Sequence, residues 1–327
     1  MPTRNEPGAM TDDMKQAPRY RNFPRPDEER LVFPLVQNLN DHELVPQMAK
    51  FRKEARSLWS VWEDRREARQ AELSRILKHR NKDNVVLVMT LNQGFSDLLL
   101  NWIKSCDLNG IEVRSWTLIV ALDTETAASF EAEGFAVYCD ANSYGAQRGL
   151  AVGEYGDHAF IRMMFPKTAV VQDLLELGYD VLFQDVDIIW KKDPSEILLR
   201  ADRKHLDAQF MYDGPNAYYA PLHVNSGFFF LRNTRHSREF WNMVYQNYDK
   251  MFYLGGQQRV VNTVLVGRFF RGLQLDVLPE NDFTNGHLFH IENMDSLPAD
   301  PYVVHVSWTS NLAHKMKKYH MAGLWYI

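Results

Sequence analysis

Runs of consecutive apolar residues alternate along the chain with segments in which apolar residues recur every three or four positions. The runs over 85–90, 116–122 and 181–183 are typical of strands that are covered on both faces. The spacing within 98–103 is typical of one face of a helix. Strands that alternate with helices in this way predict an α/β fold, with a mostly parallel sheet flanked by helices.

The same patterns predict further elements downstream. Asp123 is the expected N-cap of a helix over 125–133, because a short acceptor side chain there satisfies free backbone N–H groups. The remaining predicted elements are strands over 135–138, 207–212, 228–231 and 302–308, a helix over 158–177, and a helix that carries Gln257, Gln258 and Asn262. Residues 141–157 are rich in glycine, which suits either a lid over a ligand or a plain linker.

Before the first strand, the chain divides into a tail and a helical segment. Residues 1–40 are rich in proline and charge, which predicts a polar, partly disordered tail. Over residues 41–83, apolar side chains step by three and four positions, at Leu44, Met48, Phe51, Ala55, Leu58 and Trp62. This pattern predicts an amphipathic helical extension that packs on the sheet domain, acts as a spacer or self-associates. The predicted sheet domain covers residues 84–327.

Composition excludes several classes of protein. With 327 residues, of which 45% are hydrophobic, the chain can bury a large core. Its net charge of −5 and the lack of a basic stripe argue against nucleic acid as a partner. Two cysteines, Cys106 and Cys139, are too few for a disulfide framework or a cysteine zinc site. No segment has the apolar length of a membrane span, so we expect the chain as given to be soluble.

The most informative stretch runs from Gly178 to Trp190. It begins at a turn-forming glycine, continues as an apolar strand and ends in two acids, Asp185 and Asp187. Ligands of open α/β sheets bind at the carboxyl ends of the strands. Because alternate residues of an extended chain project to the same side, both acids are expected to face one ligand.

Two carboxylates at this spacing suit a hard divalent cation, with water and substrate phosphate as its other ligands. The alternative is a surface turn with two solvated acids, which is the usual explanation of an isolated Asp-x-Asp. The residues on either side of the pair are too apolar for an ordinary solvent loop, since Ile188, Ile189 and Trp190 follow directly. The sequence therefore favours a metal–phosphate site.

Other polar residues have two explanations each. Asn225, Ser226 and Gly227 are either turn residues before a strand or polar groups offered to a sugar. His305 lies alone in an apolar strand, where a structural role is commoner than a metal-ligand role. For the basic residues of the helix over 158–177, Arg162 and Lys167, a solvated face is favoured over contact with a diphosphate.

Taken together, four motifs carry a resemblance to a known family. They are the acidic strand with its following Asp193-Pro194, then Asn225-Ser226-Gly227-Phe228, then Gln258 with Asn262, and finally His305. In this order they resemble the nucleotide-diphospho-sugar transferases. These are retaining glycosyltransferases of GT-A (Rossmann-like) fold that include plant and algal xylosyl-, galactosyl- and arabinosyltransferases. The resemblance covers residues 84–327.

The resemblance implies a role for each metal-site residue. Asp185 and Asp187 match the family's Asp-x-Asp motif. The second acid of that motif binds Mn²⁺ (or Mg²⁺), and the first contacts the metal or the nucleotide. His305 matches a terminal histidine that completes the metal site. Lys315 stands where a basic residue is expected to meet the diphosphate.

It also implies roles around the transferred sugar. Gln258 matches the residue that stabilises the positive charge developing on the sugar, and Asn225 and Gly227 are assigned to the sugar or acceptor pocket. The sequence departs from the commoner Asp-Gln arrangement, because Gln257 precedes Gln258. This departure argues against an acid or nucleophile at that position.

The predicted function is metal-dependent transfer of a sugar from a nucleoside-diphosphate donor, UDP by resemblance, to a hydroxyl of a glycan or glycoprotein, with retention of configuration. The alternatives are a non-catalytic sugar-nucleotide-binding or scaffold protein and an Asp-dependent phosphohydrolase. The phosphohydrolase fits less well, because Ile189 stands where its motif has Thr or Val. The resemblance implies the Golgi lumen if an N-terminal anchor is missing from this chain, and the cytoplasm otherwise.

Overall fold

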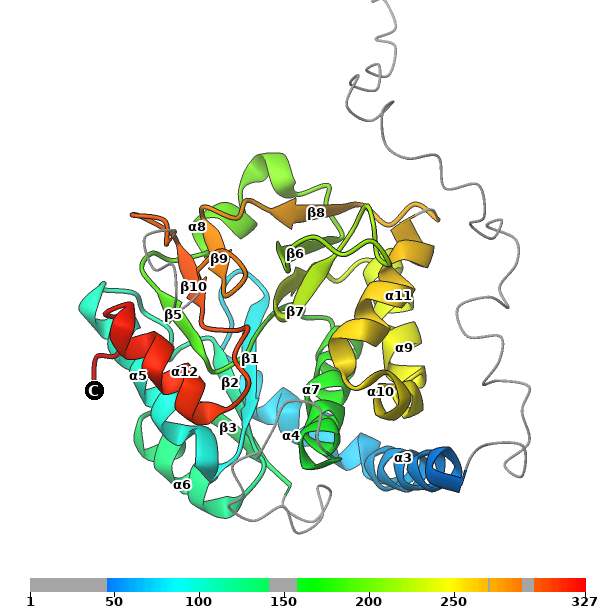
Figure 1. The fold of residues 1–327 in the computed structure, drawn as a ribbon. Coiled ribbons are helices and arrows are strands. Elements are labelled where there is room, and N and C mark those ends of the chain that lie inside the picture. Colours follow the sequence, from blue (N-terminus) through cyan, green and yellow to red (C-terminus); the bar gives the residue numbers. More distant parts are fainter. Residues whose placement is uncertain (1–45, 141–157, 270, 290–296) are drawn as a thin grey trace, which may run out of the picture. The chain divides into compact units, whose positions relative to one another are not determined.

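The computed structural model describes residues 46–140, 158–269, 271–289 and 297–327 (Figure 1). Its centre is a seven-stranded sheet in which β7 is antiparallel to its neighbours and the other strands run parallel to one another. In spatial order the strands are β3 (Ala136–Cys139), β2 (Thr117–Ala121), β1 (Val85–Leu91), β4 (Asp180–Gln184), β7 (Val224–Leu231), β6 (Ala208–Tyr212) and β8 (Leu275–Leu278). The predicted α/β fold with a mostly parallel sheet is confirmed.

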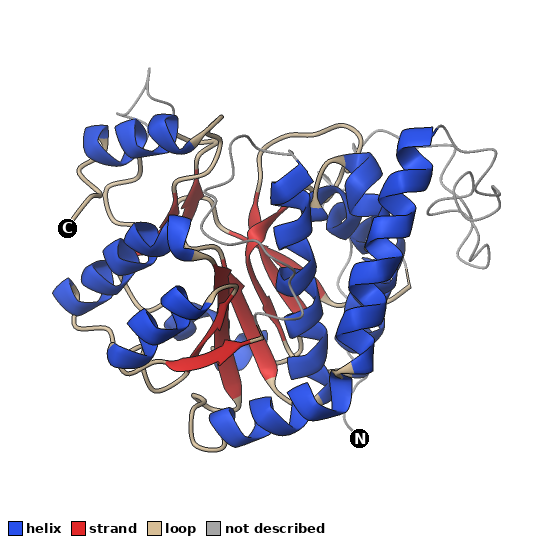
Figure 2. Ribbon diagram, turned by 90° about the horizontal axis from the view of Figure 1, so that it is seen from below, coloured by secondary structure: helices blue, strands red, loops and turns tan. Residues whose placement is uncertain are grey.

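Helices cover both faces of this sheet (Figures 1 and 2). They are α3 (Pro46–Asp64), α4 (Arg66–Leu77), α5 (Ser96–Leu108), α6 (Thr124–Ala132), α7 (His158–Glu176), α8 (Ser195–Leu198), α9 (Arg235–Gln246), α10 (Asp249–Leu254), α11 (Gln257–Phe269) and α12 (Leu312–Met321), with short 3₁₀ turns η1 (Gln93–Phe95) and η2 (Ala201–Arg203). Asp123 caps α6 as predicted, by accepting from the Thr126 N–H. Alternate residues of β1, such as Leu87 and Met89, join one core with Trp102 of α5.

The chain also forms a second sheet, which has three strands. It consists of β5 (Ile188–Trp190), β10 (Val303–His305) and β9 (Phe283–Asn285). The chain leaves β4 at Gln184 and enters β5 at Ile188, so the acidic pair lies in the link between the two sheets. β10 is shorter than predicted, because Val306 N–H donates to the Asp187 carbonyl and not to a neighbouring strand.

The Asn225-Ser226-Gly227 segment is part of a strand. β7 already begins at Val224, which pairs with Tyr212 of β6. The Gly227 carbonyl accepts a 2.7 Å hydrogen bond from the Asp185 N–H. The interpretation of these residues as a turn before the strand is therefore wrong, and Gly227 lies directly beside Asp185.

The helical extension packs on the sheet domain. α3 contacts α10, and α4 contacts β3. The Arg69 guanidinium pairs with Asp173 of α7 at 2.7 Å and lies 3.8 Å from the centre of the Trp62 ring. Self-association and the division at residue 83 stay predictions. The predicted tail 1–40, the start of the extension at 41–45 and the glycine-rich segment 141–157 lie outside the described residues.

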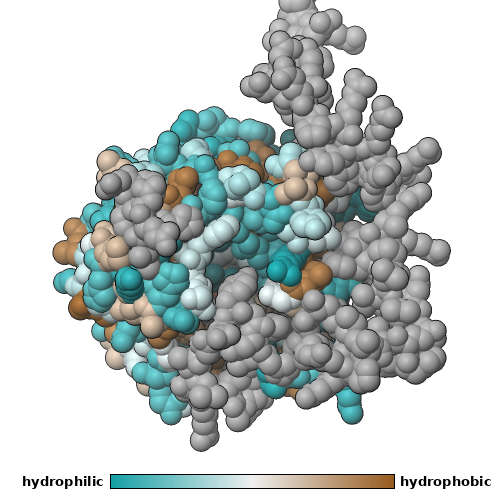
Figure 3. Space-filling model, in the orientation of Figure 1, coloured by the Kyte–Doolittle hydropathy of each residue, from teal (hydrophilic) through white to brown (hydrophobic). Residues whose placement is uncertain are grey.

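In the part of the chain that the structure describes, no helix combines the length and the apolar character needed to cross a bilayer. On the face drawn in Figure 3, hydrophobic residues form small patches separated by hydrophilic ones. Scattered apolar residues of this kind are usual on a protein surface that faces water.

We expect Asp173→Ala to lower the free energy of unfolding by about 3–5 kcal/mol, because it leaves the Arg69 guanidinium buried without its partner. Burial raises the pKa of the Asp173 carboxyl although Arg69 lowers it, so burying this pair is costly and breaking it costs more. Urea denaturation measures the loss. The matched control is Asp202→Ala, which breaks an exposed pair with Arg200 and should cost about 1 kcal/mol or less. Equal losses would contradict the prediction.

Candidate functional site

A cavity of about 710 Å³ opens at the carboxyl edge of the large sheet. Its walls come from the ends of β1, β4 and β6, the start of β7, and helices α7, α11 and α12. The volume lies within the range of small-molecule sites, and the position is where α/β sheets bind ligands. The cavity is lined by every predicted site residue, namely Asp185, Asp187, Asn225, Gly227, Gln258, His305 and Lys315.

The acidic pair and His305 form one cluster. Potential ligand atoms of Asp185, Asp187 and His305 all lie within 4.8 Å of one another. The His305 Nε2 atom is 3.1 Å from Asp187 Oδ1. Antiparallel pairing of β5 with β10 sets Ile188 opposite His305. The pairing thus places His305 beside the two acids, although it lies far from them in the sequence.

Each acid is also held by a lysine. Lys167 of α7 donates to Asp185 Oδ1 at 2.6 Å, and Lys315 of α12 donates to Asp187 Oδ2 and to the Val306 carbonyl. The Lys167 side chain is only 4% exposed, so its interpretation as part of a solvated face is wrong. Lys167 lines the cavity, and sequence reasoning set it aside because its orientation depends on how α7 packs against β4.

The neighbours of the buried Asp187 determine its ionisation. Burial alone would raise the pKa of the Asp187 carboxyl, but Lys315 and His305 outweigh burial and hold that pKa well below its ordinary value. Asp187 is therefore a carboxylate at neutral pH, the form that binds cations.

Gly227 lies against this cluster. A Cβ atom built on it would be 2.5 Å from both Asp185 Oδ2 and His305 Cε1, and 2.8 Å from Asn225 Oδ1. A side chain at this position would have to displace these neighbours, so glycine lets β7 approach the acids without moving them. The predicted Gly227 thus acts by leaving space beside the cluster.

The cluster fits a divalent metal ion such as Mn²⁺ or Mg²⁺. Two carboxylates and an imidazole are a suitable donor set for such an ion. Adjacent ligands of a six-coordinate ion bound at about 2.1 Å lie about 3 Å apart, which agrees with the 3.1 Å between His305 and Asp187. In addition, the buried His305 Nδ1 has no hydrogen-bond partner among the described residues.

Asp213 organises the other half of the cavity. It follows β6, is 5% exposed, and accepts hydrogen bonds at 2.6 Å from both Asn225 Nδ2 and Gln258 Nε2. Asn285 Nδ2 and Trp308 Nε1 donate to the same carboxylate, at 3.2 and 3.4 Å. Sequence reasoning did not single out Asp213, because an Asp followed by Gly214 and Pro215 is typical of an ordinary turn. An acid directly after a predicted parallel strand was the signal that could have found it.

Gln258 is fixed at both ends of its amide. Its Nε2 donates to Asp213, and its Oε1 accepts from the Ser226 N–H at 3.3 Å. Asn262, on the same face of α11, instead binds both backbone groups of Val224 and so joins the helix to β7. Gln257 donates to Thr168 and is 1% exposed. The structure therefore presents Gln258 as a preorganised amide, and Asn262 and Gln257 as its support.

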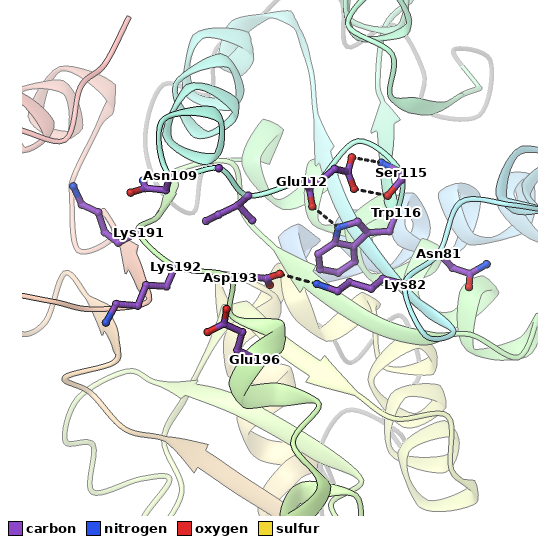
Figure 4. A pocket seen from close by; sticks show the side chains of 12 residues that line it. Asn81, Lys82, Asn109, Glu112, Ser115, Trp116, Lys191, Lys192, Asp193 and Glu196 are labelled. Atoms are coloured by element: carbon purple, nitrogen blue, oxygen red, sulfur yellow. Dashed lines mark hydrogen bonds and ion pairs between the residues drawn. The ribbon is translucent and has the colours of Figure 1, made fainter.

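A second cavity of about 690 Å³ lies at the opposite ends of the strands (Figure 4). Lys82 lies three residues before β1, Trp116 directly precedes β2, and Lys191 follows β5. Its charged groups are engaged within the protein, since Lys82 donates to Asp193 at 2.6 Å and Lys191 donates to Tyr326 Oη at 2.6 Å. The cavity that holds the acidic cluster is thus the better candidate site.

Several characterised proteins are similar in sequence. The β-arabinofuranosyltransferase RAY1 of Arabidopsis thaliana is 26% identical over 75% of this chain and 48% of its own length. The arabinosyltransferase XEG113 of the same plant is 25% identical over 73% and 40%. A UDP-galactose:fucoside alpha-3-galactosyltransferase of Dictyostelium discoideum is 24% identical over 75% and 44%. The chain therefore spans less than half the length of these three relatives.

Among solved structures, the galactosyltransferase LgtC with donor and acceptor sugar analogues is 12% identical, with a TM-score of 0.45 over 74% of this chain and 96% of its own. Mouse xyloside xylosyltransferase 1 is 12% identical, with a TM-score of 0.41 over 68% and 96%. The decisive match is to the family itself, since the sequence model of the nucleotide-diphospho-sugar transferases aligns with residues 112–319. With well over half of its length matched, the chain belongs to the nucleotide-diphospho-sugar transferase family.

Proposed function

We propose that this chain is a metal-dependent glycosyltransferase that moves a sugar from a nucleoside diphosphate to a hydroxyl of a glycan or glycoprotein. The observation that carries the proposal is the cluster of Asp185, Asp187 and His305 with two lysines at the edge of a ligand-sized cavity. Family membership supports sugar transfer as the chemistry of that cluster.

UDP as the carrier is part of the proposal. It is supported by the name of the Dictyostelium relative, which acts on UDP-galactose. Retention of configuration and a location in the Golgi lumen rest on the family resemblance alone.

The donor diphosphate would bind at the metal cluster. Asp185, Asp187 and His305 would hold the ion, which when bound neutralises charge on the departing diphosphate. Lys315 adds a positive charge at the same place. The N-terminus of α12 also lines the cavity, and its free N–H groups favour an anion there.

The transfer step is a substitution at the anomeric carbon of the donor sugar. The bond from that carbon to the diphosphate oxygen breaks, and a bond to the acceptor oxygen forms on the same face. The acceptor proton leaves to the diphosphate oxygen. The Gln258 amide, held by Asp213 and Ser226, is positioned to stabilise the positive charge that develops on the sugar. Asn225 and Gly227 would border the sugar or acceptor.

Binding is the first test. In a panel of UDP- and GDP-sugars with and without Mn²⁺, we expect the melting temperature to rise only when nucleotide and metal are both present, because each holds the other at the cluster. A ligand at about 100 times its Kd adds about 2.7 kcal/mol of stability. Samples with EDTA are the control. Unaltered melting across the panel would contradict the proposal.

We expect Asp187→Asn to reduce Mn²⁺-dependent hydrolysis of the bound sugar nucleotide by at least about a hundredfold, since it removes a charged metal ligand. The matched control is Asp193→Asn, which lies at the other end of β5 beside the second cavity and should leave hydrolysis unchanged. Circular dichroism checks that both variants fold. Full activity of Asp187→Asn would remove this residue from the site.

Gly227→Ala is expected to weaken Mn²⁺ binding by about tenfold to a hundredfold, because the added methyl group displaces Asp185 and His305. Isothermal titration calorimetry with Mn²⁺ in the presence of UDP measures the Mn²⁺ affinity. Gly110→Ala is the control for the cost of substituting a glycine. Gly110 has a φ of +67° but open space around it, so the change should lower stability and leave Mn²⁺ affinity intact. Equal affinities for both variants would count against the proposed cluster.

A further inference from the structure

Trp308 is an exposed aromatic residue on the wall of the candidate site. It follows His305 by three positions, lines the same cavity, and is 48% exposed. Its backbone has a φ of +56°, a left-handed conformation that a bulky residue rarely adopts. Such conformations persist only where the surroundings impose them, and they cluster at functional sites.

Two contacts fix the direction of the indole ring. Its Nε1 donates to Asp213 Oδ1 at 3.4 Å, and the His287 ring packs on it in a T-shaped arrangement with 5.4 Å between centres. His287 is itself confined by Gly214, whose absent Cβ would lie 2.4 Å from the His287 ring. The indole is therefore oriented before any ligand arrives, while the residue as a whole is 48% exposed.

Small polar residues flank Trp308 in the sequence and line the same cavity. Ser307, Thr309, Ser310 and Asn311 line the cavity on either side of Trp308. A sugar ring presents apolar C–H groups on its faces and hydroxyl groups around its edge. An aromatic face next to hydroxyl and amide groups matches both features.

We propose that Trp308 is the platform on which a sugar ring of the acceptor stacks, so that the acceptor is a glycoside. The inference rests on the proposed function. Trp308 contacts Asp213, which holds Gln258, so it adjoins the place assigned to the anomeric carbon. The metal and diphosphate have their own residues in the acidic cluster and Lys315, and the acceptor must approach the anomeric carbon from solvent.

The experiment measures transfer from the active UDP-sugar to methyl glycosides of arabinose, galactose, xylose and fucose. We expect Trp308→Ala to raise the KM for the accepted glycoside by about tenfold, which corresponds to about 1.4 kcal/mol. Its effect on donor hydrolysis without acceptor should be much smaller. Trp308→Phe keeps a ring but loses the N–H, and should recover most of the affinity. Tyr218→Ala removes an aromatic side chain that is 92% exposed outside the cavity, and should change nothing.

The outcomes separate this inference from the proposed function. An unchanged acceptor KM in Trp308→Ala would overturn the inference about the acceptor platform. A loss of affinity confined to the nucleotide would also overturn it, because it would show that the ring contacts the donor. If the unsubstituted protein cleaves the sugar nucleotide but no glycoside accelerates turnover, the acceptor is not a glycoside and only this inference fails. If the unsubstituted protein neither binds nor cleaves any sugar nucleotide, the proposed function itself fails.

Discussion

The site depends on the antiparallel pairing of β5 with β10. The chain crosses from the large sheet to the small one through Asp185 and Asp187, and the next residue, Ile188, pairs with His305. The register of this pairing decides which side chain of β10 faces the acids, because a shift by one residue would turn His305 to the other side. Val306 N–H, bound to the Asp187 carbonyl, fixes that register at its end.

The acidic cluster places two carboxylates close together, which is unfavourable without compensating positive charge. Two carboxylates in one cluster repel each other, and burial adds a further cost for Asp187. Lys167 and Lys315 offset both effects, each by binding one oxygen of one acid. In the protein without metal, the two lysine charges therefore balance the two carboxylate charges. A divalent ion bound there would add further positive charge, which is why the proposed function assigns an anionic diphosphate to this cluster.

The fold and the position of the acidic pair at the sheet edge were predictable because their signals are local. Thirteen consecutive residues contain both the strand and the two acids. The acids are separated by one residue, so an extended chain points them to the same side. His305 was connected to the pair only through the family resemblance, because it lies far from them in the sequence. Asp213 and Lys167 could not be assigned, because their roles depend on which strand ends and helices meet in space. The turn interpretation of Asn225-Ser226-Gly227 failed for the same reason. Glycine and asparagine suit a turn locally, but here a strand partner and a close approach to Asp185 required them.

The helical extension also bears on the site, although all of it lies before the residues that the family model matches. Arg69 of α4 binds Asp173, and Glu54 of α3 binds Arg162, both on α7. Lys167 lies between these two attachments on the same helix, about one and a half turns from each. Lys167 reaches Asp185 from a nearly buried position on this helix. The extension is therefore attached to the helix that carries Lys167, on both sides of that residue.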